Sequence, residues 1–400
     1  MKGKKIIVGI SGGIASYKSA QLVRLFVQAD VLTRVAMTQN ATRFITPLTF
    51  EALSGNRVIH DMFDREGTSI EHISWGQEAD LIIIAPATAN IIAKMANGIA
   101  DDFLSTMIIA ATAKILICPS MNSRMFMNPA LKHNLSLLKE RGMTVMEPGE
   151  GELACHTEGP GRLPEPADIF EQALILLSEQ DLKGLNILVT AGPTTEPIDP
   201  VRYITNRSSG KMGYALARAA RRRGASVTLV SGPTSLKPPF GVKFRSVKTT
   251  EDMMRSVFEN RPDTDIIIKA AAVSDYRPRE SANRKIKKKS DSLSLELIKN
   301  PDILAQLGSA KKDFPCLLVG FAAETEDLLA NAREKLRTKN LDMIVANDIS
   351  RNDAGFETDT NVVKLIYVDG KVEDLPLMTK DEVADLIIDR LKSLKENNNT

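Results

Sequence analysis

Residues 5–16 read Lys-Ile-Ile-Val-Gly-Ile-Ser-Gly-Gly-Ile-Ala-Ser, an apolar run that leads into a glycine loop. In the segment that follows, residues 17–28, Leu22, Leu25 and Phe26 share one helical face. A strand, a glycine turn and a helix in this order are typical of a parallel α/β sheet. Further β-branched runs predict strands at residues 33–37, 81–85, 115–118 and 143–146, and a closing helix is expected at 167–177.

The same pattern starts again at residues 182–193, Leu-Lys-Gly-Leu-Asn-Ile-Leu-Val-Thr-Ala-Gly-Pro. We expect strands at 187–190, 226–230, 265–270, 317–320 and 343–347, and helices at 210–222, 326–338 and 380–395. Asp369-Gly370 predicts a hairpin between residues 362–368 and 371–377. The sequence therefore predicts an α/β protein with two doubly wound Rossmann-like domains, residues 1–180 and 181–400.

Composition and charge exclude several classes of protein. The chain has 400 residues, 43% of them hydrophobic and 26% charged, with a formal net charge of +2. That charge gives no general attraction to nucleic acid or to a membrane surface. No apolar run approaches the ~18 residues of a membrane span, and the three cysteines form no CxxC pair. We expect a cytoplasmic protein without nucleic-acid or membrane partners.

The first glycine loop predicts a phosphate site, because glycines allow close approach and a helix N-terminus attracts anions. A dinucleotide is disfavoured, since the spacing is not GxGxxG and the next strand ends in Met37-Thr38 without an acidic residue. A mononucleotide fits better than a dinucleotide, although a lone Gly-Gly pair by itself favours a tight strand-to-helix turn without a ligand. Residues 86–90, Pro-Ala-Thr-Ala-Asn, are equally consistent with a ligand-binding loop and an ordinary one.

Three further segments carry a family resemblance. They are Cys-Pro-Ser-Met-Asn-Ser-Arg-Met at 118–125, Ala-Cys-His-Thr-Glu-Gly-Pro-Gly-Arg at 154–162, and Glu-His-Ile at 71–73. With the two loops above, they resemble the flavin-containing cysteine decarboxylases, specifically phosphopantothenoylcysteine decarboxylase, over roughly the first 180 residues. Phe126 departs from the Trp or Tyr usual in that family. The resemblance implies FMN as the cofactor, bound by Ser11, Gly12, Gly13, Ile14, Ala15, Thr38, Pro86, Ala87, Thr88, Asn90, Ser105 and Thr106.

The resemblance also implies a mechanism. FMN would oxidise the cysteinyl CH₂–SH of phosphopantothenoylcysteine to a thioaldehyde, so that CO₂ can leave, and its electrons would return to give 4′-phosphopantetheine. His72 is implied as the acid/base near the flavin, Asn122 as the contact to the substrate carboxylate and amide, and Cys155 as the proton donor to the enethiol. The family builds these sites between subunits, which implies a homo-oligomer, a dodecamer of trimeric flavin domains and dimeric ligase domains.

A second motif, Ile-Thr-Asn-Arg-Ser-Ser-Gly-Lys-Met-Gly at 204–213, opens a predicted helix. It is not a Walker A loop, because Met212 follows the lysine where Ser or Thr would hold Mg²⁺. An anion cradle at a helix N-terminus stays possible. So does a plain helix start with Ser208 or Ser209 as the N-cap.

This motif belongs to a set that resembles phosphopantothenate–cysteine ligase over residues 183–368. The set includes Ala-Ala-Ala-Val-Ser-Asp-Tyr at 270–276, Lys-Ile-Lys-Lys at 285–288, Asn-Pro-Asp-Ile at 300–303 and Gly-Phe-Ala-Ala-Glu-Thr at 320–325. The resemblance implies that CTP and 4′-phosphopantothenate form an acyl-cytidylate and pyrophosphate, and that L-cysteine then displaces CMP. The whole chain thus resembles the bifunctional decarboxylase–ligase family of coenzyme A biosynthesis.

Roles in the second half follow from the resemblance and suit the residue types. Lys335 and Lys339, at i and i+4 on one helical face, would bind the triphosphate, and Asp275 would hold the nucleotide and Mg²⁺. Lys285 would stabilise developing phosphate charge, and Asn206 would contact the activated acyl group. The implied CTP-binding residues are Ala271, Ala272, Val273, Asp275, Lys285, Asn300, Pro301, Asp302, Ile303, Phe321, Lys335 and Lys339, with Phe321 packing on the base. Ser274 replaces the alanine usual in this family.

Two other functions stay open at this point. The chain could be an electron-transfer or sensor flavoprotein, which would not need His72, Asn122 and Cys155 together. It could also be a ligase whose first half is only an oligomerisation scaffold. Taken alone, the basic run at 284–289 would be a solvated loop.

Overall fold

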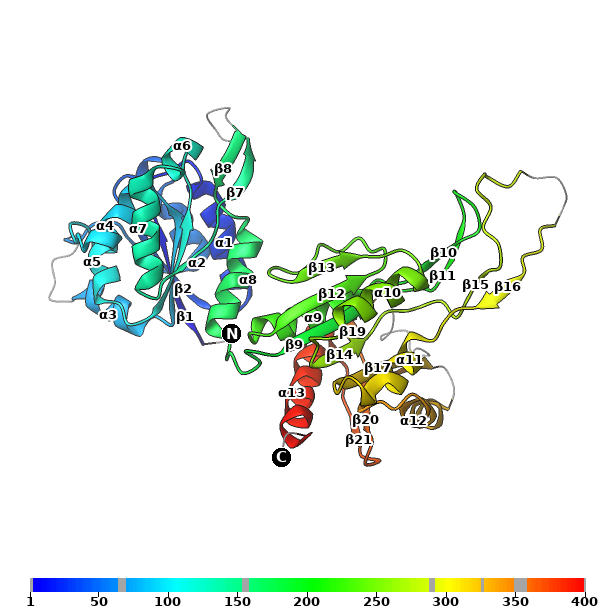
Figure 1. Cartoon of the computed structure of the whole chain (residues 1–400). Coiled ribbons are helices and arrows are strands. Elements are labelled where there is room, and N and C mark those ends of the chain that lie inside the picture. Colours follow the sequence, from blue (N-terminus) through cyan, green and yellow to red (C-terminus); the bar gives the residue numbers. More distant parts are fainter. Residues whose placement is uncertain are drawn as a thin grey trace. The chain divides into compact units, whose positions relative to one another are not determined.

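The structure is a computed structural model that describes residues 3–63, 70–152, 158–287, 292–324, 327–348 and 358–398. The chain divides into two compact units, residues 1–178 and 179–400, and each is considered by itself (Figure 1). Among the described residues, no helix is both long enough and apolar enough to cross a membrane.

The first unit is built on a parallel sheet with the strand order β3-β2-β1-β4-β5-β6. Every residue of its central strand β4 is buried, as expected for a parallel strand covered on both faces. Ile82 and Ile84 pack with residues of the helices on one face, whereas Ile83 points to the other face. The strands are β1 (Lys5–Ile10), β2 (Leu32–Met37), β3 (Val58–Ile59), β4 (Leu81–Ala87), β5 (Lys114–Pro119) and β6 (Thr144–Val145).

Eight helices cover this sheet within the described residues of the first unit, and α1 packs against α2 and α8, α3 against α5, and α4 against α7. They are α1 (Ser16–Gln28), α2 (Pro47–Ser54), α3 (Glu71–Glu78), α4 (Ala89–Asn97), α5 (Phe103–Ala110), α6 (Ser123–Phe126), α7 (Pro129–Glu140) and α8 (Pro166–Leu177), with a short 3₁₀ turn η1 (Ala41–Arg43). A separate antiparallel hairpin consists of β7 (Gly149–Glu152) and β8 (Glu158–Arg162).

The second unit contains a larger sheet with the order β13-β12-β9-β14-β17-β18-β20-β21, in which only the last two pairings are antiparallel. Its strands are β9 (Asn186–Ala191), β12 (Ser226–Ser231), β13 (Lys243–Ser246), β14 (Ile266–Lys269), β17 (Leu317–Glu324), β18 (Met343–Asp348), β20 (Val363–Tyr367) and β21 (Val372–Asp374). The described part also contains a small pairing of β19 (Thr360–Asn361) with β22 (Met378–Thr379).

Helices cover both faces of this second sheet. Ile266 and Ile268 of β14 belong to the core that includes α9 (Lys211–Arg222) and α13 (Lys380–Asn398). Ile267 instead packs in the core formed with α10 (Thr250–Asn260), α11 (Ile303–Ser309) and α12 (Leu328–Thr338). A 3₁₀ turn η2 (Ala310–Lys312) follows α11. Because side chains alternate along a strand, the residue after Ile268 is on the face of α11 and α12.

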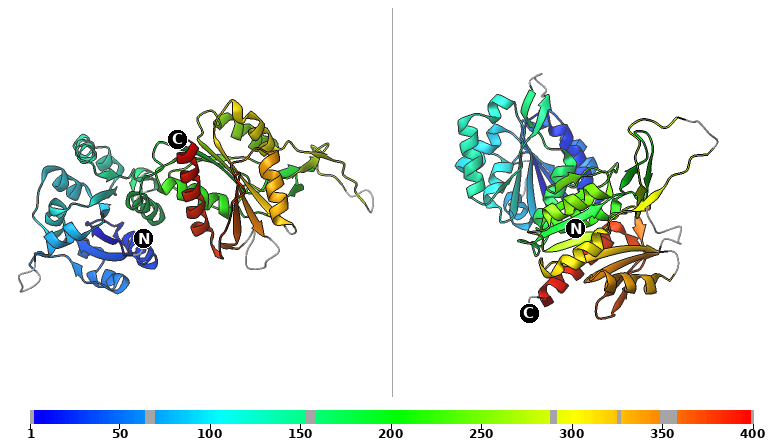
Figure 2. Two further views of the ribbon diagram at one scale, coloured as in Figure 1. Left: turned by 90° about the horizontal axis from the view of Figure 1, so that it is seen from below. Right: turned by 45° about the vertical axis from the view of Figure 1, so that its right-hand side comes forward.

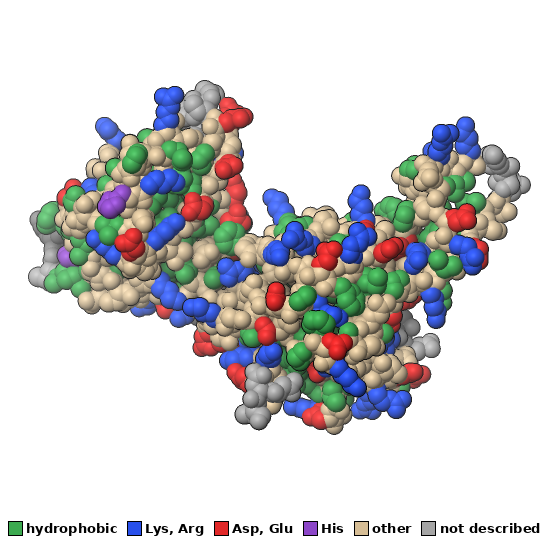
Figure 3. All heavy atoms as spheres, viewed as in Figure 1, with side chains coloured by type: hydrophobic (Ala, Val, Ile, Leu, Met, Phe, Trp, Pro, Cys, Tyr) green, Lys and Arg blue, Asp and Glu red, His purple; other side chains and the backbone are tan. Residues whose placement is uncertain are grey.

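Two hairpins project from the second unit as an arm, β10 (Thr195–Pro197) with β11 (Tyr203–Thr205) and β15 (Tyr276–Pro278) with β16 (Leu297–Lys299) (Figures 1 and 2). Buried Asp199 joins them, since its carboxylate accepts hydrogen bonds from the N–H groups of Val201, Arg202 and Ile286. Exposed basic side chains lie on this arm (Figure 3).

The predicted fold class is confirmed: two α/β units with parallel, doubly wound sheets are present. Most predicted strands and helices occur within one or two residues of their expected bounds. The hairpin around Asp369-Gly370 is present, although its second strand ends at Asp374 and not at residue 377. Three differences stand out. The strand expected at 143–146 spans only Thr144–Val145, the last helix continues to Asn398, and the arm hairpins were not predicted. The arm strands are short and partly exposed, so they lack the apolar, β-branched runs from which the other strands were predicted.

Candidate active sites

The ligand crevice of the first unit lies where its strand order reverses. From β1 the chain continues to β2 on one side and later returns to β4 on the other, and such a switch point is the usual ligand site of an open α/β sheet. Buried Ser11 ties the two strand ends together. Its hydroxyl donates to the carbonyl of Pro86 at 2.7 Å and accepts from the N–H of Thr88 at 2.9 Å. Both predicted loops therefore belong to one site.

A cavity of about 520 Å³ opens at this switch point. Five residues predicted to bind the cofactor line it, namely Ser11, Gly12, Thr38, Thr88 and Asn90. The glycine at position 12 is required by packing, because a Cβ there would lie 2.6 Å from the Cβ and 2.9 Å from the backbone carbonyl carbon of Asn40. Asn40 itself lines the cavity, together with Gln39 and Met125.

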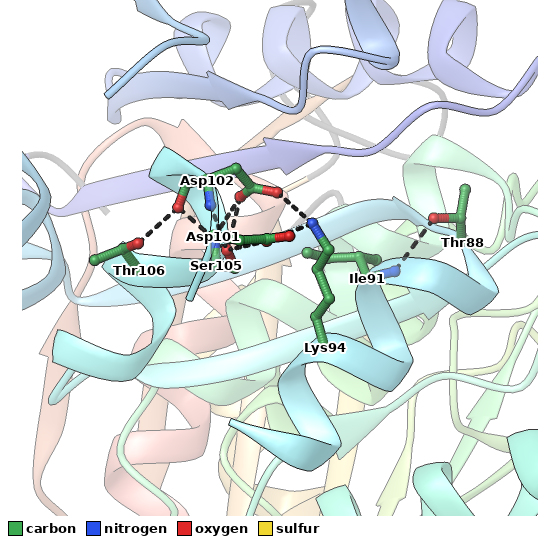
Figure 4. A network of polar contacts seen from close by, with 7 residues as sticks. All are labelled: Thr88, Ile91, Lys94, Asp101, Asp102, Ser105 and Thr106. Atoms are coloured by element: carbon green, nitrogen blue, oxygen red, sulfur yellow. Dashed lines mark hydrogen bonds and ion pairs between the residues drawn. The ribbon is translucent and has the colours of Figure 1, made fainter. Parts of the chain in front are cut away.

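One lysine and two carboxylates meet at the edge of this cavity. Lys94 of α4 contacts the carboxylates of Asp101 and Asp102 at 2.5 and 2.9 Å (Figure 4). Burial opposes the charge on Lys94, but these two carboxylates raise the pKa of its ammonium above the ordinary value. Lys94 and Asp102 were not predicted as site residues, because a lysine and an aspartate eight residues apart show no sign of pairing in the sequence.

The structure separates the other predicted cofactor residues from the cavity lining. Ser105 and Asp102 form a capping box at the start of α5, and the hydroxyl of Thr106 donates to the carbonyl of Asp102 at 2.7 Å (Figure 4). The hydroxyls of Ser105 and Thr106 thus form hydrogen bonds with the backbone at the start of α5. The remaining five belong to the loop after β1 or to the end of β4 without lining the described cavity: Gly13, Ile14, Ala15, Pro86 and Ala87.

Of the three catalytic residues implied for this unit, two are described. His72 is half-buried in the first turn of α3, and Asn122 is the N-cap of α6, where its side chain accepts from the N–H of Arg124 at 2.8 Å. Neither is among the described residues that line the cavity. Cys155 lies outside the described residues.

Two motifs of the family resemblance, at 118–125 and 154–162, lie in contact with each other. The N–H of Met121 donates to the carbonyl of Gly161 at 2.9 Å, which places β8 against the segment that precedes α6. The approach is close, since a Cβ on Gly159 would lie 2.8 Å from the Ser123 hydroxyl. The described end of the 154–162 motif therefore packs directly on the Pro-Ser-Met-Asn segment.

The second unit repeats the arrangement at its own switch point, because β9 lies between β12 and β14. A cavity of about 510 Å³ opens there. All but one of the predicted ligase residues line it. They are Asn206, Ala271, Ala272, Val273, Asp275, Asn300, Pro301, Asp302, Ile303, Phe321, Lys335 and Lys339. The exception is Lys285, which is exposed on the projecting arm and absent from the described lining.

Hydrogen bonds hold the loop after β14 against its neighbours. Asn206 donates its amide to the carbonyl of Val273 at 3.0 Å, and Asn300 donates its amide to the carbonyl of Ser274 at 2.8 Å. Thr194 accepts from the N–H of Ser274 at 3.0 Å. Asn206 and Asn300 therefore shape the cavity wall as well as facing the ligand space.

Cationic groups gather at one end of this cavity. Lys339 forms an ion pair with Asp302 at 2.8 Å, and Lys335 lines the cavity from the same helix. Burial acts against the charge of Asp302, but the hydrogen bonds from Lys339 and from the N–H of Ala305 lower its pKa below the ordinary value. Lys269, which was not predicted, lines this end as well.

The opposite wall includes the N-terminus of α9. The N-cap of α9 is Gly210 in a left-handed conformation, so the alternative of a helix start capped by Ser208 or Ser209 is contradicted. Lys211 follows it, and the buried Lys380 of α13 reaches the same cavity. Burial and the positive charge of Lys211 lower the pKa of Lys380 to about 8, although Asp359 opposes this shift. Lys380 was missed because it begins a helix far along the chain.

The described residues contain no group of three or more His, Cys, Asp or Glu side chains placed to hold a metal ion. Asp275 supplies one exposed carboxylate at the cavity. This still fits Mg²⁺, which usually takes one or two protein carboxylates, with substrate phosphates and water as its other ligands.

Two doubly wound α/β units, each with a cavity at its switch point, define a class of protein with two separate candidate ligand sites. Comparisons with known proteins narrow this class. Residues 1–177 match the family described as Flavoprotein, and residues 182–394 match the DNA/pantothenate metabolism flavoprotein C-terminal domain. The coenzyme A biosynthesis bifunctional protein CoaBC of Bacillus subtilis is 47% identical over 401 residues, which is 99% of this chain and 98% of that protein.

The protein of the same name from Escherichia coli K12 is 46% identical and spans 98% of this chain and 97% of its own length. Among solved structures, a CoaBC C-terminal domain is 45% identical and covers 55% of this chain and 100% of its own, with a TM-score of 0.48. The chain belongs to the family of bifunctional coenzyme A biosynthesis proteins. It is a bifunctional enzyme with a flavoprotein decarboxylase domain and a ligase domain.

Proposed function

We propose that the first unit binds FMN and decarboxylates phosphopantothenoylcysteine, and that the second uses CTP and Mg²⁺ to join L-cysteine to 4′-phosphopantothenate. One observation supports this most strongly: each sheet has a cavity at its switch point, and residues that the matching family resemblance names line both cavities, five of them in the first unit and twelve in the second. The domains would then be residues 1–180 and 181–400. The product of the second unit is the substrate of the first.

In the first unit, FMN supplies the oxidation and re-reduction that make loss of CO₂ possible. The cavity suits such a ligand, because Gly12 and Thr88 line it between two strand ends, where the backbone can approach a phosphate closely. Hydroxyl and amide groups of Thr38 and Asn90 remain to donate hydrogen bonds to phosphate or to the isoalloxazine ring. His72, Asn122 and Cys155 are proposed to handle the substrate.

In the second unit, Lys335 and Lys339 are proposed to bind the triphosphate, and Asp275 a magnesium ion. These charges would stabilise the pyrophosphate as the substrate carboxylate attacks the α-phosphorus. Phe321, half-buried at the cavity, offers an aromatic face for the base. At the opposite wall, Lys211 and Lys380 offer positive charge for the phosphate of 4′-phosphopantothenate.

The direct test uses the freshly purified whole chain. Denaturation should release FMN, and addition of CTP, Mg²⁺ and 4′-phosphopantothenate without cysteine should release pyrophosphate and leave an acyl-cytidylate. ATP in place of CTP should support this step poorly. Release of FAD or of no chromophore would refute the flavin assignment, and equal use of ATP would refute the choice of CTP.

The glycine loop allows a sharp prediction. Gly12→Ala should lower the FMN content of the purified protein on the order of tenfold or more, because its new methyl group collides with the backbone of Asn40. Gly13→Ala is the matched control, since a Cβ there first meets the Thr88 methyl at 3.5 Å, an ordinary contact. FMN content is measured by absorbance against protein concentration. Equal FMN content in the two variants would contradict this account of the loop.

A homo-oligomer is part of the proposal, and the position of Lys285 motivates a test of it. Lys285 is on the arm and is absent from the described lining of the cavity of its own chain. If the arm completes the cavity of a second subunit, a mixture of Lys285→Gln and Asn206→Asp chains forms one intact site per mixed dimer. Reassembled mixtures should then recover roughly a quarter of wild-type ligase activity by random pairing. Mixtures as inactive as the separate variants would place Lys285 in its own cavity.

A further inference from the structure

Lys269 is an unusual residue for its position. It ends β14, which lies inside the parallel sheet between β9 and β17, and it follows three fully buried isoleucines. Its side chain is half-buried and lines the 510 Å³ cavity. Within the described part of the chain, its ammonium has no hydrogen bond and no ion pair. An amine held in this way without a partner costs stability unless a ligand uses it.

The surroundings of Lys269 are predominantly basic. By strand alternation it is on the face covered by α11 and α12. The ionisable groups that face it in the described structure are Lys335 of α12, Lys339 at the C-cap of α12, Asp302 at the N-cap of α11, and Asp275 of the loop after β14. Asp302 is already paired with Lys339 and accepts from the N–H of Ala305. An anion at this end of the cavity would therefore meet three ammonium groups.

We propose that Lys269 is a third phosphate-binding lysine of the ligase site, which contacts the polyphosphate of the bound nucleoside triphosphate together with Lys335 and Lys339. This inference rests on the proposed function of the second unit, and it assigns a role to a residue outside the motifs that carry the family resemblance. A purely structural role is disfavoured, because the side chain faces the cavity and makes no hydrogen bond to any neighbour that the structure describes.

The proposal predicts that nucleotide binding is coupled to the uptake of protons. Burial and the charge of Lys339 lower the pKa of Lys269 to about 8 in the free protein, with Lys335 acting in the same direction and Asp302 and Asp275 opposing. Phosphate oxygens beside the amine favour its charged form and raise that pKa again. Nucleotide binding should therefore take up about half a proton at about pH 8, more as the pH rises, and almost none well below pH 7. Affinity should fall as the pH rises above about 8.

Isothermal titration of the whole yellow protein with CTP and Mg²⁺ tests this. Omission of 4′-phosphopantothenate prevents reaction, and titration in two buffers of different ionisation enthalpy measures the protons taken up. Lys269→Met should lose the proton uptake and weaken binding at neutral pH by on the order of 10- to 100-fold, the usual effect of a lost charged hydrogen bond. Lys269→Arg keeps the charge at every pH, so it should lose the uptake but bind as well in alkaline buffer as in neutral buffer.

Lys243→Met is the control, because it removes an exposed lysine of β13 that is absent from the described cavity lining. It should bind CTP with wild-type affinity and proton uptake. Wild-type protein that binds CTP without proton uptake, or Lys269→Met protein that binds with unchanged affinity and uptake, would overturn the inference alone. Wild-type protein that does not bind CTP would overturn the proposed use of CTP as well. Thermal unfolding of each variant verifies that it is folded.

Discussion

Lys285→Gln is expected to lower pyrophosphate release from CTP and 4′-phosphopantothenate by roughly 10²–10³-fold or more. The substitution removes a fixed positive charge where phosphate charge develops, and one preorganised electrostatic group commonly contributes an effect of that size. Decarboxylation of supplied phosphopantothenoylcysteine should not change, because that reaction uses only the first unit. The measurement compares pyrophosphate and CO₂ release for wild type and variant.

Lys287→Gln is the matched control, since Lys287 is an exposed lysine of the same loop. It should leave pyrophosphate release within a few-fold of wild type. Full ligase activity in Lys285→Gln would show that Lys285 has no role in the reaction and is one charge in a solvated basic loop. Loss of decarboxylation in a folded, yellow Lys285→Gln protein would contradict the separation of the two activities.

Cys155→Ser is expected to stop the decarboxylase before its last step, with a loss of 4′-phosphopantetheine formation on the order of 10²–10⁴-fold. Oxidation and loss of CO₂ do not need the thiol, but reduction of the enethiol needs a proton donor, and a serine hydroxyl is a much weaker acid. One equivalent of CO₂ should therefore appear while the yellow absorbance is lost and the enethiol accumulates. Single-turnover absorbance with product analysis measures this.

Two comparisons sharpen the result. His72→Asn should block an earlier step, so that neither the flavin colour nor CO₂ release changes when substrate is added. Cys316→Ser alters a half-buried thiol of the second unit, where burial raises the pKa of the thiol, and should turn over normally. Normal 4′-phosphopantetheine formation by Cys155→Ser would remove that thiol from the mechanism.

Much of the fold could be read from local pattern. The strands are short continuous runs of apolar, β-branched residues, and the helices have an apolar face with a period of about 3.6 residues. The sequence shows both patterns directly, and the strands Lys5–Ile10 and Ser226–Ser231 appear almost as expected. The arm hairpins were not predicted, because their strands are short and are held by residues far away in the sequence. Asp199, for example, holds the arm through the N–H of Ile286, far along the chain.

The candidate sites likewise contain some residues that the sequence could identify and others that it could not. Residues in motifs, such as Ser11 and Asn206, could be named from resemblance, and the structure places them at cavities. Lys94, Lys269 and Lys380 could not, because each becomes a site residue only through burial and through neighbours from other elements. A lone lysine in a sequence is most often solvated. Ser105 shows the opposite case, since a residue named by resemblance is used here to cap a helix.

The central claim is that one chain carries out both reactions in sequence. The most direct measurement incubates the whole protein with 4′-phosphopantothenate, L-cysteine, CTP and Mg²⁺, and quantifies pyrophosphate, CMP, CO₂ and 4′-phosphopantetheine. The account predicts all four in equal amounts, with phosphopantothenoylcysteine as the intermediate that accumulates in the His72→Asn variant. Formation of phosphopantothenoylcysteine without CO₂ by the folded, FMN-loaded wild type, or CO₂ release from supplied phosphopantothenoylcysteine without any ligation, would contradict it.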